Sequence, residues 1–276
     1  MTEKVFPAPA SMAPGANVRP LRGRNVIAVA SGKGGVGKTW FSITLAHALA
    51  RMGKNALLFD GDLGLANVDI QLGFQPKRDL GQVIEGTVTL QRAAERFPDG
   101  GFDIIAGRSG SGTLATLPTQ ALSGLRNDLF DLARSYDYVI MDMGAGVDRT
   151  VRTLCGPAGT TLVVTTDEPT SITDAYAFIK LTHVTNRNAD LRVVVNVAQT
   201  LKEGDRTYGT ILKACQNFLK FKPPLAGIVR RDLKVRDAIR NQIPILTRSP
   251  QSEAANDVVQ LAMRLVKDKE ARAGKE

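Results

Sequence analysis

A glycine-rich segment near the N-terminus constrains the fold of this chain more than any other feature. It reads Ser31-Gly32-Lys33-Gly34-Gly35-Val36-Gly37-Lys38-Thr39. The run from Gly32 fits G-x-x-x-x-G-K-[ST], in which glycines let the backbone turn tightly and direct N–H groups at phosphate oxygens. A strand-like segment, Asn25–Ala30, precedes the run, and helical apolar spacing follows it from Trp40 to Arg51. The order strand, glycine loop, helix places a bound phosphate at the positive end of a helix.

The residue types in this loop predict a nucleotide site that uses Mg²⁺. Lys38 is expected to reach the β- and γ-phosphates, and the hydroxyl of Thr39 to hold the metal. The competing interpretation is a glycine-rich turn with solvated lysines. The cofactor-binding residues predicted here are Gly34, Gly35, Val36, Gly37, Lys38, Thr39 and Trp40.

Carboxylates follow two other strand-like segments. Asp60 and Asp62 come at the end of the apolar run Asn55–Asp60, and Asp142 ends Tyr138–Asp142. In an open α/β sheet, residues at the carboxyl ends of strands lie beside the ligand. We therefore expect Asp142 near the metal. The alternative, that each aspartate caps the helix that follows, is less favoured because three aspartates at strand ends accompany the loop.

The apolar pattern predicts one α/β domain with a doubly wound, mostly parallel sheet flanked by helices. We assign residues 1–24, which are rich in proline, to a disordered arm, residues 25–268 to the domain, and residues 269–276 to a charged tail. A chain of 276 residues with 43% hydrophobic residues can bury a core of this size. The strands are expected at Asn25–Ala30, Asn55–Asp60, Asp103–Ala106, Tyr138–Asp142, Thr160–Thr166, Leu191–Val197 and Leu225–Val229.

The second lysine of the loop, Lys33, makes the segment resemble the deviant Walker A ATPases, the P-loop family that contains MinD and ParA. The resemblance implies an ATP-dependent homodimer with Mg²⁺, in which Lys33 reaches the ATP of the partner subunit. It also implies slow regulatory hydrolysis of ATP to ADP and phosphate. Lys33, Lys38 and Asp62 would then be catalytic, with Asp62 orienting the attacking water. Thr39, Asp60 and Asp142 would serve the metal, Asp60 by supporting Mg²⁺ and its waters.

Two further segments resemble the FlhG or FleN branch, whose members are MinD-like regulators of flagellar number. They are 64–69 and 167–177, and the resemblance extends from about Asn25 to Val266. It implies a partner that regulates flagellar transcription or assembly. An N-terminal activating motif for a flagellar GTPase, often found in that branch, is not recognisable in residues 1–24. ATP-dependent amide-forming or reductase enzymes on related scaffolds are disfavoured because a cluster-binding cysteine pair is missing.

The resemblance also suggests the adenine site. Asn196 matches the asparagine that reads the base in the family, and an amide can both donate to and accept from adenine. Asp232 lies in the loop that closes over the base. Two residues depart from the family pattern: Arg230 stands where a proline is usual, and Trp40 where a small polar residue is usual.

Charge and hydropathy limit the other partners. The formal net charge is +9, and residues 202–248 hold eleven Lys and Arg against four Asp and Glu. Such a region can bind DNA nonspecifically, as ParA-like relatives do, or can solvate helix faces. The apolar stripe at Val258, Leu261 and Leu265 is assigned to a last core helix, so membrane binding is expected to be weak or absent.

The sequence shows no apolar leader, and its two cysteines, Cys155 and Cys215, are distant from each other. Both observations argue against secretion and secreted partners. We therefore expect a cytoplasmic protein, with the inner-membrane surface or a cell pole as alternative addresses.

Overall fold

The computed structural model describes residues 23–107 and 117–273. Its centre is an eight-stranded sheet in the order β3-β4-β2-β5-β1-β6-β7-β8, in which only β3 runs antiparallel to its neighbour. The doubly wound, mostly parallel sheet predicted from the sequence is confirmed. The strands are β1 (Gly23–Ser31), β2 (Ala56–Gly61), β3 (Glu95–Phe97), β4 (Phe102–Ile105), β5 (Tyr138–Ala145), β6 (Ala158–Thr165), β7 (Leu191–Ala198) and β8 (Leu225–Arg230).

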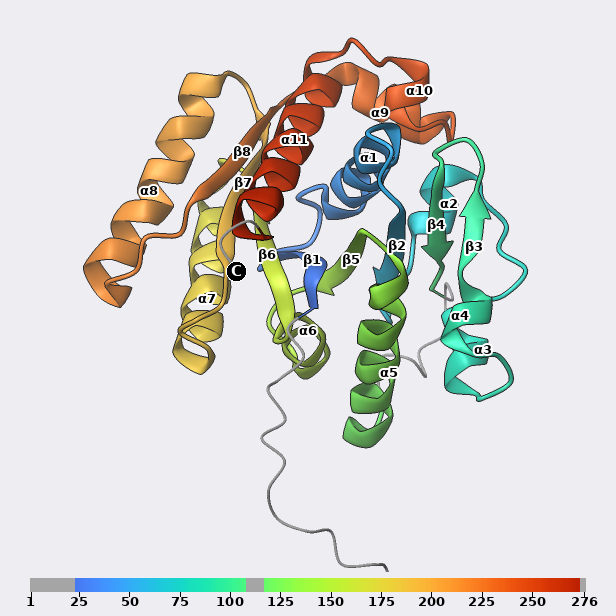
Figure 1. The fold of residues 1–276 in the computed structure, drawn as a ribbon. Helices are drawn as coiled ribbons and strands as arrows, with labels where there is room; N and C mark the ends of the chain where they lie inside the picture. The colour runs from blue at the N-terminus through green and yellow to red at the C-terminus, as the bar shows by residue number, and fades with distance from the viewer. Residues whose placement is uncertain (1–22, 108–116, 274–276) are drawn as a thin grey trace, which may run out of the picture.

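Helices cover both faces of this sheet (Figure 1). They are α1 (Lys38–Arg51), α2 (Val68–Leu72), α3 (Leu80–Ile84), α4 (Leu90–Ala93), α5 (Thr119–Leu132), the 3-10 turn η2 (Ala133–Ser135), α6 (Arg149–Cys155), α7 (Pro169–Thr185), α8 (Leu201–Leu219), α9 (Leu233–Arg240), α10 (Ile245–Arg248) and α11 (Glu253–Ala273). Strand β1 alternates between the two faces: Val26 and Ala28 pack with α3 to α8, whereas Ile27 and Val29 pack with α1 and α9 to α11. Two apolar cores result, one on each face.

The edge of the sheet differs from the sequence prediction. We expected seven strands, and the described part of the chain has an eighth, β3, which pairs with β4 in an antiparallel hairpin. Its three residues, Glu-Arg-Phe, are too few to show an alternating pattern. The hairpin turn closes at Gly101, whose φ of +66° suits glycine.

The C-terminal helix is longer than predicted. Helix α11 continues to Ala273, so the predicted boundary at residue 268 falls inside a helix, and residues 269–273 are not a separate tail. Lys269 Nζ donates to the backbone oxygen of Asp137 at 2.5 Å and lies 4.2 Å from the centre of the Tyr138 ring. Arg272 donates to Asp190 Oδ2 at 3.0 Å. These contacts hold the basic end of the helix against the sheet.

The stripe along α11 is core, as predicted: Val258, Leu261 and Leu265 are buried. Within the described ranges, no helix combines the length and the apolar character needed to cross a membrane. At the other end of the chain, Gly23 and Arg24 begin β1, and the rest of the predicted arm lies outside the described residues.

Candidate functional site

The glycine loop leaves β1 at the point where the chain connections diverge. Strand β1 lies between β5 and β6, so the loop sits at the switch point of the sheet, where open α/β sheets bind their ligands. Gly35 and Gly37 have φ of +79° and +88°, a backbone conformation that residues with a side chain rarely adopt. A Cβ at Gly37 would also lie 2.5 Å from Asn196 Nδ2. The loop geometry therefore requires glycine at this position.

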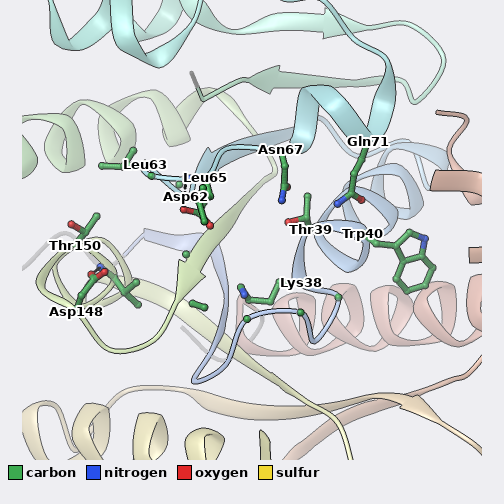
Figure 2. A pocket seen from close by; sticks show the side chains of 18 of the residues that line it. Lys38, Thr39, Trp40, Asp62, Leu63, Leu65, Asn67, Gln71, Asp148 and Thr150 are labelled. Carbon is green, nitrogen blue, oxygen red and sulfur yellow. Dashed lines mark hydrogen bonds between the residues drawn. The ribbon is translucent and has the colours of Figure 1, made fainter. Parts of the chain in front are cut away.

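A cleft of about 520 Å³ opens above the loop. Figure 2 shows Lys38 and Thr39 on the loop side and Asp62 across the cleft from Lys38. Four other residues that line it were not predicted as site residues: Asn67, Gln71, Asp148 and Thr150. They follow β2 or β5, so their position after strands that end at the same edge was the available signal.

The side chain of Lys38 is buried beneath the cleft, with 8% of the residue exposed. Burial lowers its pKa, and the negative charges of Asp142 and Asp62 oppose that shift. An additional anion nearby would stabilise the charged form of this buried ammonium group. This environment suits the phosphates of a nucleotide.

Asp60 and Asp142 lie side by side in the carboxyl-terminal halves of β2 and β5, where they are register partners. Burial raises the pKa of Asp60 to about 8, helped by the charge of Asp142 and opposed by three backbone N–H donors, of which Asn67 and Val68 bind Oδ2 at 3.1 and 3.2 Å. Burial raises the pKa of Asp142 to about 6, against hydrogen bonds from Thr39 and Ser42 and the charge of Lys38.

This pair fits a hard divalent cation. Mg²⁺ prefers oxygen ligands and usually takes one or two carboxylates together with substrate phosphates. Thr39 lines the cleft and is hydrogen-bonded to Asp142, so these two residues could hold the ion. Ser42, which sequence reasoning missed, donates to Asp142 Oδ1 at 3.0 Å. It lies one helical turn after Thr39, and that spacing was its only signal.

Lys33 stands apart from Lys38 in this conformation. Its ammonium group donates to Glu168 Oε2 at 2.6 Å and to Thr170 Oγ1 at 2.8 Å, both at the start of α7. The side chains of Lys33 and Glu168 are 37% and 61% exposed. The loop also packs closely on α7, since a Cβ at Gly32 would lie 2.1 Å from the backbone oxygen of Asp174. Lys33 is therefore bound within its own subunit at the rim of the site.

A second cavity of about 330 Å³ adjoins the loop, and it brings together Trp40, Asn196 and Asp232. Asn196 Nδ2 donates to the backbone oxygen of Val36 at 2.8 Å, so this side chain also braces the phosphate loop. Asp232 caps α9 by accepting from Lys234 N at 2.8 Å. The predicted adenine residues thus lie in one cavity, although both already make contacts within the chain.

The two departures from the family pattern line this cavity as well. Arg230 is held by Asp257 at 2.8 Å and by Glu253 at 2.5 Å. Trp40 is buried in α1, and its indole nitrogen has no hydrogen-bond partner among the described residues. The other lining residues include Leu233 and Ile239 of α9 and Val197 of β7.

Comparison with known proteins assigns this arrangement to a family. The family model described as the CobQ/CobB/MinD/ParA nucleotide binding domain matches residues 27–245, most of the chain. The chain belongs to this family. The P-loop fold and the MinD/ParA relationship predicted from Lys33 and its loop are therefore confirmed.

Among similar proteins, the antiactivator FleN of Pseudomonas aeruginosa is 39% identical over 83% of this chain and 82% of its own length. The flagellum site-determining protein YlxH of Helicobacter pylori is 30% identical over 90% of this chain and 83% of its own. The solved structure of MinD from Pyrococcus horikoshii, complexed with Mg-ADP, covers 87% of this chain and 95% of its own at 23% identity, with a TM-score of 0.72. The FlhG/FleN branch predicted from the sequence is thereby supported by relatives as well as by motifs.

Proposed function

We propose that this MinD/ParA-family protein is a Mg²⁺-dependent ATPase that works as a dimerisation switch. The observation that carries the proposal is the contrast between the two loop lysines. Lys38 is buried under the cleft, whereas Lys33 lies at its rim and donates to exposed groups of the same subunit. A rim lysine of this kind can be released towards a second subunit.

In the proposed reaction, the loop N–H groups and Lys38 bind the β- and γ-phosphates of ATP. Mg²⁺ held by Thr39 and Asp142, with Asp60 supporting its waters, would neutralise negative charge on the phosphates. Asp62 lines the cleft opposite Lys38 and would orient the attacking water. The water oxygen then bonds to the γ-phosphorus as the bond to ADP breaks, which gives ADP and phosphate.

The switch follows from where the γ-phosphate lies. With ATP bound, Lys33 would leave Glu168 and bind the phosphates of the partner subunit, so each subunit completes the site of the other. Hydrolysis removes the group that Lys33 binds, and the dimer loosens. The dimer would differ from the monomer in the surface offered to partners.

For the biological role, we propose control of flagellar number or placement through a transcription or assembly regulator. Support comes from the names of two relatives, an antiactivator and a flagellum site-determining protein. We place this action in the cytoplasm, with recruitment to the inner membrane or a cell pole as alternatives. Intrinsic membrane binding should be weak, because the apolar stripe of α11 is used in the core.

A second candidate function is nonspecific DNA binding by the ATP dimer, as in partition ATPases. The basic residues between 202 and 248 favour it, but they are spread over α8, β8, α9, α10 and the connections between them, and Arg230 and Arg248 are already ion-paired. A salt-sensitive shift of duplex DNA that requires ATP would support this function. No shift at low salt would exclude it.

Phosphate release tests the enzymatic proposal directly. Wild-type protein should release phosphate from ATP in Mg²⁺ and lose activity in EDTA. Lys38→Ala should lose nucleotide binding, because it removes the buried cation. Asp62→Ala should keep binding but slow hydrolysis by about two orders of magnitude or more, since it removes the group that positions water. Equal activity in wild type and Asp62→Ala would contradict the proposed role of Asp62.

A further inference from the structure

Helices α7 and α8 share an outer face on which apolar and basic side chains are mixed. We define the α7–α8 face by Tyr176, His183 and Val184 of α7, Phe218 and Phe221 at the end of α8, and the cations around them. The two helices pack side by side, at the edge of the molecule shown in yellow and orange (Figure 1). Val184 is 69% exposed and Phe218 is 76% exposed.

Two ring contacts pair side chains of α7 with side chains at the end of α8. The rings of Tyr176 and Phe218 meet edge to face, with centroids 6.5 Å apart, and those of His183 and Phe221 stack at 4.4 Å. On α7, residues 176, 180, 183 and 184 lie within one stripe, since they recur at three- and four-residue spacing, and Arg187 follows shortly after the helix ends. The apolar groups therefore follow a seam between two helices and are not scattered singly.

The charges on this face have one sign. Residues 176–189 and 206–224 contain six Lys and Arg and no Asp or Glu. Lys180, Arg187, Lys213 and Lys222 are exposed, and none of them belongs to an ion pair among the described residues. The basic residues beside the end of α11 differ, because Arg192 and Arg272 both pair with Asp190, and Arg192 also pairs with Asp268.

We propose that the α7–α8 face binds an acidic amphipathic helix of a partner protein. A helix laid along the seam would cover Val184 and Phe218 with its apolar side, which is the usual mode of helix recognition. Glutamates or aspartates on the flanks of that helix would face Lys180 and Lys222 and would favour correct encounter.

The observations favour a protein helix over other anionic partners. Duplex DNA would contact the cations through its phosphates but would leave the exposed phenylalanine ring facing water. An anionic bilayer would take up protruding apolar groups, yet Tyr176, His183 and Phe221 are only partly exposed, and they lie along a seam between packed helices. A rod-shaped partner with one apolar side matches this shape and charge.

This inference goes beyond the ATPase switch and does not depend on nucleotide. Helix α7 nevertheless connects the two regions, because it begins at the partners of Lys33 and ends at Val184 and Thr185.

Binding can be measured with a designed probe and full-length protein. The probe is a fluorescent helical peptide with leucines on one side and glutamates on the other; its counterpart carries lysines in place of the glutamates. By fluorescence anisotropy without nucleotide, wild type should bind the acidic peptide and not the basic one. Phe218→Ala should weaken binding about tenfold, because it removes an exposed anchor. Lys180→Glu with Lys222→Glu should weaken it at least as much.

Matched controls alter the same properties elsewhere. Met263→Ala removes an exposed apolar side chain from α11, and Lys77→Glu with Lys267→Glu makes the same charge change at exposed positions. Both should bind the peptide like wild type. Failure of wild type to bind, equal binding of both peptides, or equal losses in the control variants would overturn the proposal. Binding to duplex DNA or to vesicles containing phosphatidylglycerol that Phe218→Ala abolishes, without peptide binding, would also overturn it.

Discussion

At the scale of single residues, the same side-chain type has two environments within one loop. Lys38 is buried, and that burial lowers the pKa of its ammonium group. Bound phosphate would therefore offset the free-energy cost of burying this charge. The ammonium group of Lys33, five positions earlier, makes an exposed ion pair and a hydroxyl contact with the described residues. Exposed ion pairs contribute about 0–1 kcal/mol, so the contact that holds Lys33 can be broken cheaply.

Replacing Glu168 tests whether that contact opposes dimerisation. Glu168→Gln removes the carboxylate that holds Lys33, so the ATP dimer should form more readily. Two such exposed pairs break when one dimer forms, each worth at most about 1 kcal/mol, so the dissociation constant of the dimer should fall no more than about thirtyfold. Sedimentation over a range of protein concentrations in Mg-ATP measures this. Arg96, which pairs with Asp103 away from the site, offers a control, and Arg96→Gln should leave the constant unchanged. A weaker dimer in Glu168→Gln would mean that Glu168 supports dimerisation.

The phosphate loop and the three aspartates could be predicted because each lies in, or just after, the carboxyl-terminal half of a strand, which determines the edge of the sheet where they meet. The partners of Lys33 could not, since they come 135 and 137 residues later in the sequence and no local pattern marks the pairing. The second roles of Asn196 and Asp232, bracing the loop and capping α9, also depend on tertiary contacts.

At the scale of elements, the position of the site depends on how α1 and α7 are packed. Helix α1 carries the loop lysine and is buried along most of its length, including His47. Helix α7 lies against the loop at Gly32. Both contacts can be tested separately from nucleotide binding.

His47 should make stability depend on pH. Burial, with a smaller contribution from the charge of Arg51, lowers the pKa of His47 to about 4. At pH values above the ordinary histidine pKa of about 6.5, the ring of His47 is neutral in both the folded and the unfolded chain, so it does not lower the free energy of unfolding. As the pH falls from 6.5 towards 4, the unfolded chain takes up the proton first. The wild type should therefore lose about 2 kcal/mol between pH 7 and pH 5 through this group.

Urea unfolding at the two pH values measures the loss. His47→Leu should remove this part of the pH dependence while leaving that of the carboxylates. Its stability at pH 7 should not fall greatly, because the replaced ring buries a nitrogen, Nδ1, without a hydrogen-bond partner among the described residues. The same pH dependence in both proteins would contradict a buried neutral His47.

Gly32 should be intolerant of a side chain. Gly32→Ala would place Cβ 2.1 Å from the backbone oxygen of Asp174, so the loop or α7 must move. We expect a destabilisation of about 1–3 kcal/mol, typical of overpacking. Gly209→Ala is the matched control, because a Cβ there meets nothing within 4 Å and alanine favours the helix. Thermal unfolding should show a loss for the first variant and none for the second.

The elements themselves were predictable to different degrees. Long buried strands such as β5 and β7 were recognisable because both faces of the sheet are covered, which gives continuous apolar runs. Strand β3 was missed because pairing with β4, and not its own sequence, makes it a strand. The end of α11 was placed too early because charged residues there look solvated, whereas Lys269 and Arg272 bind Asp137 and Asp190.

At the scale of the whole molecule, the two cores on either side of the sheet hold the site rigidly at its carboxyl edge, with Lys33 at the rim. The chain belongs to a family of nucleotide-binding domains, and its fold was predictable from the order of strands and helices. Assembly was not predictable in the same way, because a dimer depends on surfaces that no intrachain pattern fixes. The central proposal is therefore about two subunits.

The most direct test is the solution mass of Asp62→Ala, measured by light scattering in Mg-ATP and in Mg-ADP. This variant should bind ATP without hydrolysing it, so the bound state persists during the measurement. We predict a dimer in Mg-ATP, a monomer in Mg-ADP, and a monomer in both when Lys33→Ala is added. A monomer of Asp62→Ala under both conditions, or a dimer that survives Lys33→Ala, would contradict a switch in which Lys33 acts across the interface.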